Sequence, residues 1–307
     1  MATLVVPTGT SQEDGRKRRS IFRSKGAVAA YIFILPYVVF FLAFRILPAI
    51  YAGVLSFAEY GLSGSVEFIG LDNYARLLSD DLFWNSLRVT GIYTVIAIPL
   101  TVAISLGIAA LCNRTLRGMS FYRTIFFLPV VTSPVMSGII WVWIFSQNGP
   151  LTWLFNTLHV PSPDWLQSEI FVLPALAIVS AWSNFGYDML ILLAGMLAIP
   201  TEYYEAAELD GTNGWQRFRH VTLPLLKPAL FFVVVLEIIR SFQVFDTIFV
   251  MTGGGPVRAS YSLTFLIYDQ GFGYFEFGYA SAAGMVLLAI TLVVSLLQRR
   301  LLGRSTS

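Results

Sequence analysis

Six segments of this chain are long and apolar enough to cross a lipid bilayer, and they constrain its fold more than any other feature. A transmembrane helix needs about 20 consecutive, mostly apolar residues. The segments that meet this requirement are residues 27–47, 87–111, 124–145, 170–197, 225–250 and 279–297. The sequence therefore predicts an all-α, polytopic membrane protein with six transmembrane helices.

The composition excludes several other classes of protein. Hydrophobic residues make up 56% of the 307 residues and charged residues only 12%, with a mean hydropathy of +0.70. A soluble domain carries about a quarter charged residues, and a net charge of +2 offers no polybasic surface for nucleic acid. The single cysteine, Cys112, excludes an intramolecular disulfide, and His159 and His220 lie too far apart to suggest a metal site. We therefore expect an integral membrane protein without a bound metal.

Basic residues predict the orientation of the chain in the membrane. Fifteen of the 20 Lys and Arg residues lie in the two terminal tails and in the second and fourth loops, whereas the other loops hold only Arg76 and Arg258. Because cytoplasmic loops carry the excess of Lys and Arg, both termini and the loop of residues 199–224 are predicted to be cytoplasmic. The predicted organisation is a cytoplasmic tail of residues 1–26, a transmembrane domain of residues 27–300 and a second cytoplasmic tail of residues 301–307. The first tail leads into a full-length span without a small-residue cleavage site, which argues against a cleaved signal peptide.

The fourth loop carries signals for two short helices. Pro200 and Thr201 predict a helix start with Thr201 as the N-cap, and Gly211 suits the left-handed position that ends a helix. The first helix is therefore expected over residues 202–210. A second is expected over residues 215–220, ending before Pro224. A solvated interhelical loop, with charges that only provide solubility, is the alternative.

The order of residues in this loop resembles a known motif. Glu205-Ala206-Ala207, followed by Gly211 and then by Leu223-Pro224, is similar to the EAA loop of ABC importer permeases. Further segments resemble the carbohydrate-uptake group, which includes the maltose, lactose and glycerol-3-phosphate permeases. They are Phe68-Ile-Gly-Leu-Asp-Asn-Tyr74, Arg123-Thr-Ile-Phe-Phe-Leu-Pro129 and the run from Phe242 to Pro256. The chain looks like the first of two non-identical permease subunits, without the large periplasmic insertion of the maltose protein.

The resemblance implies partners and a set of coupling residues. In that family the loop helix docks on a cytoplasmic ATPase. The implied coupling residues are Glu205, Ala206, Ala207, Asp210, Gly211, Leu223 and Pro224. The implied partners are a second permease subunit in a heterodimer, a homodimeric cytoplasmic ATPase and an extracytoplasmic solute-binding protein, at a bacterial or archaeal cytoplasmic membrane. No Walker A motif is present in the sequence, so ATP and Mg are expected on the ATPase and no cofactor on this chain.

Ionisable residues at membrane depth mark a candidate substrate path. A charged side chain costs at least about 2.5–3.5 kcal/mol at mid-bilayer, so it normally faces a cavity or a partner. Asp188 lies in the fourth span, and Glu237, Arg240 and Asp246 lie in or near the fifth. Glu237 and Arg240 are three residues apart and can pair on one helical face. This pair is either structural or part of a ligand site.

Neutral polar residues lie at a similar depth. Ser180, Asn184 and Tyr187 follow each other at i, i+4 and i+7, which places them on one stripe of a helix. Hydroxyl, amide and aromatic groups suit a sugar, since a sugar needs hydrogen-bond partners and a ring to stack against. In the resemblance to the maltose permease these three positions match substrate contacts, whereas ordinary interhelical packing is the alternative. The predicted substrate-path residues are Ser180, Asn184, Tyr187, Glu237, Arg240, Ser241 and Gln243.

Three classes of function remain for comparison. The first is the permease subunit of an ATP-driven importer that moves a sugar, a polyol or a glycerol derivative by alternating access. In the second, an ion-gradient-driven secondary transporter, Asp188 or Glu237 would be the ion site near broken helices. An intramembrane enzyme would need a nucleophile with a base or a metal pair, and both histidines are in predicted loops. The loop pattern favours the first class, so the chain is not expected to be an enzyme.

Overall fold

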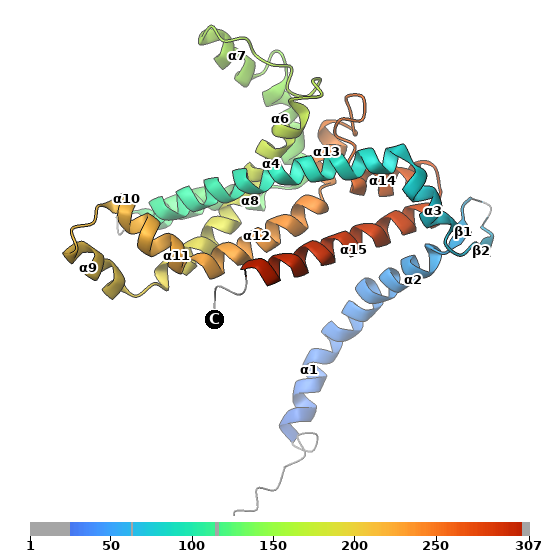
Figure 1. The fold of residues 1–307 in the computed structure, drawn as a ribbon, viewed down its shortest axis with the longest axis horizontal. Coiled ribbons are helices and arrows are strands. Elements are labelled where there is room, and N and C mark those ends of the chain that lie inside the picture. The colour runs from blue at the N-terminus through green and yellow to red at the C-terminus, as the bar shows by residue number, and fades with distance from the viewer. Residues whose placement is uncertain (1–24, 63, 114–116, 303–307) are drawn as a thin grey trace, which may run out of the picture. The chain divides into compact units, whose positions relative to one another are not determined.

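The computed structural model describes residues 25–62, 64–113 and 117–302, and the side chains of those between 30 and 300. Apart from one short hairpin, the secondary structure of these residues is helical (Figure 1). Within the described segments four helices have the length and composition to cross a membrane, and two bent helix pairs raise the number to as many as six. The four are Ala30–Leu55, α4 (Asp81–Cys112), α8 (Val172–Leu197) and the part of α15 (Phe277–Leu302) that ends at Arg300. The prediction of an all-α polytopic membrane protein is confirmed at this level.

The chain divides into two compact units, of which the first comprises residues 1–51. Its helix begins as α1 (Lys25–Phe41), widens into the π-helical turn η2 (Leu42–Ile46) and continues as α2 (Leu47–Leu55), which extends into the second unit. From residue 30 to residue 51 every side chain except the half-buried Ile46 is exposed. An apolar helix without its own core fits a lipid environment.

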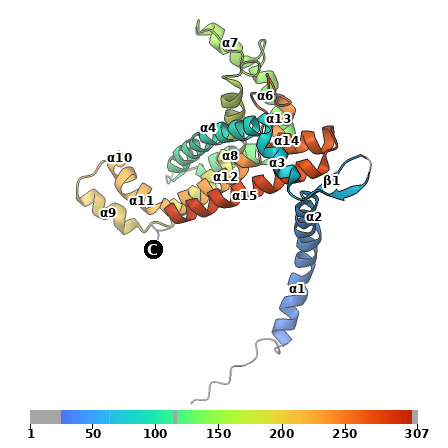
Figure 2. The same cartoon turned by 45° about the vertical axis from the view of Figure 1, so that its right-hand side comes forward.

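The second unit is built around the packing of α4 against α8, which run alongside each other (Figures 1 and 2). Helix α12 (Lys227–Phe242) packs on both of them, and α15 packs on α12. Buried apolar residues of α4 and α8 form the centre of the core, together with those of α13 (Asp246–Met251) and α14 (Leu263–Tyr268). Helix α5 (Met119–Val131) covers another face of α8.

The third predicted span, residues 124–145, is broken in the structure. Helix α5 ends at Val131, and α6 (Pro134–Phe145) starts after two intervening residues. At this break the chain bends by 96° between Met119–Val131 and Pro134–Thr157. Ser133 precedes a proline and takes an extended conformation with ψ of 134°, because the proline ring disfavours the helical region for the residue before it. Helix α7 (Pro150–Thr157) follows α6.

The fifth predicted span, residues 225–250, is also interrupted, so the prediction of one continuous helix was wrong. Helix α12 ends at Phe242 and α13 begins at Asp246. The carbonyl groups released at the break accept hydrogen bonds from side chains far along the sequence. Thr264 Oγ1 donates to the Phe242 carbonyl at 3.1 Å, and Ser262 Oγ donates to the Val244 carbonyl at 3.2 Å. These bonds replace the lost helical hydrogen bonds, so the two buried carbonyl groups are not left without partners.

A hairpin that the sequence analysis did not predict precedes α3 (Asp72–Ser79). Strands β1 (Ala58–Tyr60) and β2 (Val66–Phe68) pair antiparallel. Asn73 Nδ2 donates to the carbonyls of Ser56 at 3.1 Å and of Ala58 at 2.9 Å. Strands of three residues are too short to show a period of two in the sequence, so the hairpin could not be predicted from its pattern. In the structure, the Asn73 side chain ties the start of the hairpin to α3.

Gly186 sets the distance between α8 and α5. A Cβ atom at this position would lie 2.4 Å from the Phe126 carbonyl oxygen and 3.1 Å from the Phe127 Cα atom, both in α5. We expect Gly186→Ala to force the helices apart and to lower the free energy of unfolding by about 1–3 kcal/mol, measured by thermal unfolding in detergent. Gly107→Ala in α4 is the matched control, because nothing lies within 4 Å of its Cβ position. Equal melting temperatures for the two variants would contradict this packing argument.

Candidate functional site

The loop between α8 and α12 forms two short helices. The first, α9 (Thr201–Leu209), agrees with the predicted helix of residues 202–210 to within one residue at each end. The expected N-cap was wrong: Pro200 takes the cap position, and Thr201 is the first helical residue. Gly211 has a φ of +73°, as its predicted left-handed role requires. The Thr212 amide donates to the Ala207 carbonyl at 3.1 Å and the Gly211 amide to that of Glu208 at 3.0 Å, which is a Schellman closure.

The second loop helix is longer than predicted. It starts as α10 (Gly214–Arg217), passes through the π-helical turn η3 (Phe218–Thr222) and ends as α11 (Leu223–Leu225). The prediction that it ends before Pro224 was wrong. In the wide turn the Leu223 amide donates to the Phe218 carbonyl, five residues back. This shift of the ladder lets a proline follow without ending the helix.

Side chains brace the two loop helices against each other. Asn213 and Gln216 form a capping box, with bonds of 2.9 Å and 2.8 Å, at the start of α10. The Arg217 guanidinium pairs with Glu208 at 3.1 Å, and the Tyr204 and Thr222 hydroxyls lie 3.0 Å apart. With both helix ends closed and two links between them, the loop is an ordered element.

The coupling residues implied by the sequence fall on different sides of this loop. Glu205, Ala206, Asp210, Gly211 and Pro224 are exposed, Leu223 is half-buried and Ala207 is buried. Exposed apolar side chains accompany them, since Leu209 is 89% exposed and Trp215 67% exposed. Large apolar side chains gathered at the surface are typical of an interaction site. They favour this interpretation over a loop that only faces solvent.

A groove of about 1070 Å³ lies where the loop meets the ends of α4 and α8. Gly107 and Ala110 line it from α4, Met196 from α8, and Tyr204 and Phe218 from the loop helices. The groove therefore belongs to the same end of the molecule as the loop.

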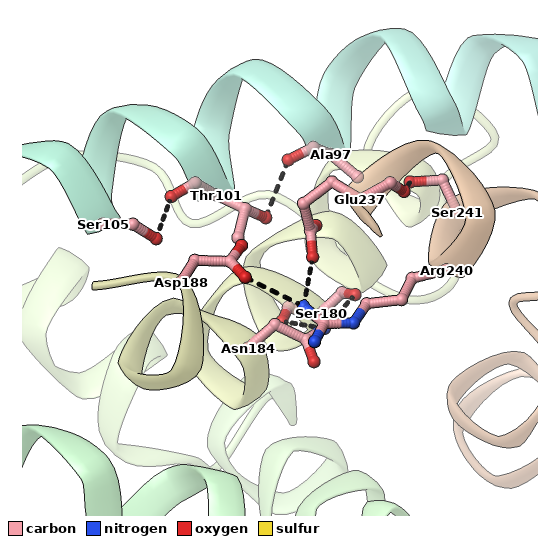
Figure 3. A network of polar contacts seen from close by, with 9 residues as sticks. All are labelled: Ala97, Thr101, Ser105, Ser180, Asn184, Asp188, Glu237, Arg240 and Ser241. Carbon is pink, nitrogen blue, oxygen red and sulfur yellow. Dashed lines mark hydrogen bonds and ion pairs between the residues drawn. The ribbon is translucent and has the colours of Figure 1, made fainter. Parts of the chain in front are cut away.

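Three ionisable residues form a cluster between α8 and α12 (Figure 3). Arg240 Nη1 lies 2.7 Å from Glu237 Oε1 and 3.1 Å from Asp188 Oδ1. The side chains of Asp188 and Glu237 are 0% and 2% exposed, whereas that of Arg240 is 32% exposed. The predicted pair of Glu237 and Arg240 is present, and Asp188 is a third member that spacing within one helix could not reveal.

The cluster carries one more carboxylate than it has cations. Asp188 Oδ2 is buried and has no hydrogen-bond partner among the described residues. Two buried carboxylates therefore share one guanidinium in a place where an unpaired charge is costly. The sequence contained an indication of this contact, since α8 holds one acidic residue, Asp188, and no basic residue to pair with it.

The neutral residues of the predicted stripe surround this cluster. Asn184 Nδ2 donates to the Ser180 carbonyl at 2.9 Å and lies 3.3 Å from its hydroxyl. The Arg240 guanidinium carbon lies 5.1 Å from the centre of the Tyr187 ring, in the range of a cation–π contact. Ser180 and Asn184 are half-buried and Tyr187 is 41% exposed. The structure therefore brings all three residues to one partly open face.

Two other predicted path residues lie apart from this face. Ser241 is buried and donates from Oγ to the Glu237 carbonyl at 2.7 Å, which satisfies it inside α12. Gln243 is exposed at the interruption after α12, and Asp246 is exposed at the start of α13. Because the helix is interrupted between Phe242 and Asp246, the side chains of Gln243 and Asp246 do not continue the buried face of α12.

A second pocket, of about 450 Å³, lies beside the hairpin. It is lined by Glu59, Glu67, Asp72 and Glu276, and Arg76 pairs with Glu276 at 2.6 Å. Tyr261 lies outside this pocket, between α13 and α14. Burial and a hydrogen bond to Asp269 raise the pKa of Tyr261 above its usual value, so its hydroxyl stays protonated and donates. These groups are far from the ionic cluster in the sequence and make no contact with it in the described structure.

Comparison with known proteins gives a consistent result. Residues 101–306 match the family model described as "Binding-protein-dependent transport system inner membrane component". The arabinooligosaccharides transport system permease protein AraP of Bacillus subtilis is 34% identical over 308 residues, covering 97% of this chain and 95% of that protein. The sn-glycerol-3-phosphate transport system permease protein UgpA of Agrobacterium fabrum is 31% identical, covering 89% and 94%. A chain of the bacterial alginate ABC transporter, solved with an alginate pentasaccharide-bound periplasmic protein, superposes with a TM-score of 0.82 at 21% identity, covering 94% of this chain and 99% of that one.

Proposed function

Because the chain belongs to the family of binding-protein-dependent transport system inner membrane components, we propose that it is one of two non-identical permease subunits of an ATP-driven importer. A permease of this family is a multi-pass protein of the cytoplasmic membrane and a transport component rather than an enzyme. The proposed partners are a second permease subunit, a homodimeric ATPase that binds ATP and Mg, and an extracytoplasmic solute-binding protein. The family assignment leaves the secondary-transporter and intramembrane-enzyme alternatives without support.

The observation that carries the proposal is the ordered, exposed helix α9. A helix closed by a Schellman motif and braced by Arg217 and Tyr204 moves as a unit, so a push on its exposed face reaches the ends of α8 and α12. A floppy loop would absorb the same push. We propose that Glu205 and Ala206 contact the ATPase, while the buried Ala207 seats the helix on the rest of the loop.

The substrate path runs along the partly open face that holds Ser180, Asn184 and Tyr187. Polar side chains at this depth do not face lipid without cost, which supports a path or a partner on this side. The names of the relatives suggest two kinds of cargo, oligosaccharides and glycerol 3-phosphate. The substrate is thus a sugar or a related polyol or glycerol derivative, moved inward by alternating access of the two permease subunits.

Reconstitution with partners tests the assignment. We expect the purified chain in liposomes to show neither ATP hydrolysis nor uptake. Both activities should appear once the second permease subunit, the ATPase and the solute-binding protein are added together. The measurement is phosphate release and accumulation of labelled solute. Robust hydrolysis by the isolated chain, or uptake driven by an ion gradient alone, would overturn the proposal.

Substitutions on the open face test the path. Asn184→Leu and Tyr187→Leu each remove a hydrogen-bonding group, which typically costs about 1–3 kcal/mol. We therefore expect uptake to fall roughly five- to a hundredfold, while assembly with the ATPase is retained. Leu197→Ala, at an exposed apolar position at the end of the same helix, should keep normal uptake. Normal uptake by both Asn184 and Tyr187 variants would place the substrate site elsewhere.

A further inference from the structure

Arg240 joins the ionic cluster through a single nitrogen atom. Its Nη1 atom lies 2.7 Å from Glu237 Oε1 and 3.1 Å from Asp188 Oδ1. Its Nε and Nη2 atoms form no hydrogen bond with any residue that the structure describes, and neither is among the buried side-chain atoms that lack a partner. Both atoms therefore reach the accessible surface, in agreement with the 32% exposure of this side chain.

The guanidinium group is held in place from its buried side. The side chains of Asp188 and Glu237 are 0% and 2% exposed, so a molecule on the open face meets Arg240 and not the carboxylates. One acid comes from α8 and the other from α12, so the group is fixed to two helices. The Tyr187 ring, 5.1 Å from the guanidinium carbon, packs against its face. The remaining edge, formed by Nε and Nη2, is therefore preorganised.

This free edge suits a pair of neighbouring oxygen atoms. The N–H bonds of Nε and Nη2 point in the same direction, so they donate to two acceptors at once. Vicinal hydroxyl groups of a sugar ring offer such a pair, and so do two oxygens of a carboxylate or a phosphate. A purely structural ion pair would use only the Nη1 side, and it gives no reason for a fixed and accessible second edge.

We propose that Arg240 contacts the transported substrate directly, through two hydrogen bonds from its Nε–Nη2 edge to a pair of neighbouring oxygen atoms. Asp188 and Glu237 are positioning residues, which hold the guanidinium group from behind. Ser180 and Asn184 are half-buried on the same face and add a hydroxyl and an amide group beside the bound oxygens. The inference rests on the proposed function and deepens it, because it assigns the atoms that read the substrate.

Arg240→Lys tests this contact. A lysine keeps one positive charge beside the two acids, so the protein should still assemble, but it lacks the planar fork of donors. Binding is measured by saturation-transfer NMR on the permease–ATPase complex in nanodiscs, without the solute-binding protein, which selects substrates of its own. The probes are arabinotriose, a neutral sugar, and sn-glycerol 3-phosphate, an anion. We expect at least one probe to bind the wild-type complex, and Arg240→Lys to weaken that binding at least about tenfold at a nearly unchanged melting temperature.

Arg88→Lys is the matched control, because it makes the same change at an exposed residue of α4. It should bind the probe as the wild type does. Binding of arabinotriose alone would identify the oxygen pair as vicinal hydroxyls, and binding of glycerol 3-phosphate alone would identify it as part of an anionic group. An assembled Arg240→Lys complex with wild-type affinity for the bound probe would overturn the inference.

Phenylglyoxal gives a second readout on the wild-type complex, which does not depend on whether the variant folds. This reagent attaches to two nitrogen atoms of a free guanidinium group, and mass spectrometry of the peptides locates the product. We expect it to modify Arg240, and a bound probe to slow that modification at least about tenfold without affecting Arg88. No modification of Arg240, or modification that a bound probe does not slow, would overturn the inference. Failure of the proposed function would differ from both, since ATP-dependent uptake itself would be missing.

Discussion

Arg240→Leu is expected to cost about 3 kcal/mol or more of stability and to reduce the yield of folded protein sharply. Removing one partner of a buried ion pair leaves an uncompensated charge, and such changes typically cost about 3–5 kcal/mol. Here the substitution leaves two buried carboxylates, those of Asp188 and Glu237, without the single guanidinium that joins them. Thermal unfolding in detergent and the yield of monodisperse protein measure the effect.

The asymmetry of the cluster provides the control. Glu237→Gln removes the surplus acid and leaves one acid facing one base, so it should cost only about 1 kcal/mol. Adding Asp188→Asn and Glu237→Gln to Arg240→Leu should recover much of the lost stability, because no buried charge then remains unpaired. If Glu237→Gln is as damaging as Arg240→Leu, the three residues do not act as one ionic cluster centred on Arg240.

Much of this fold is predictable from sequence because membrane burial leaves a strong local signal. The apolar length of residues 170–197 sets the bounds of α8 to within two residues. The start and stop residues of α9 are as informative, since Gly211 adopts the left-handed conformation that its position indicates. Both features depend on neighbours in the sequence, and local chemistry decides them.

Features that depend on distant residues could not be predicted in this way. The interruption after Phe242 is stabilised by Ser262 and Thr264, about 20 positions further along the chain. Asp188 joins Arg240 across a separation of 52 positions. A hydropathy pattern contains no record of such pairings, although the imbalance of charge between the fourth and fifth spans was a hint. The residues of the candidate path were therefore identifiable one by one, whereas their arrangement required the three-dimensional structure.

Gly211→Val is expected to reduce uptake at least about tenfold, while the protein still inserts in the membrane. The φ of +73° at Gly211 is strongly unfavourable for a β-branched residue. The substitution should therefore undo the Schellman closure of α9 and detach Thr212 from Ala207. Glu205→Lys should have a similar effect through a different cause, because it reverses the charge of an exposed side chain on the proposed docking face. Uptake by the reconstituted importer and co-purification of the ATPase measure both.

Matched variants separate coupling from general damage. Gly214→Ala alters a glycine of the same loop whose Cβ position is open and whose φ is not left-handed, so it should keep normal uptake. Glu169→Lys makes the same charge change at an exposed residue outside the loop and should be equally harmless. Wild-type uptake by Gly211→Val or by Glu205→Lys, in a normally assembled complex, would show that α9 does not transmit the action of the ATPase. Loss of uptake with the ATPase still bound would instead place the defect in the transmission of force, since docking and the push on α8 and α12 are separate steps.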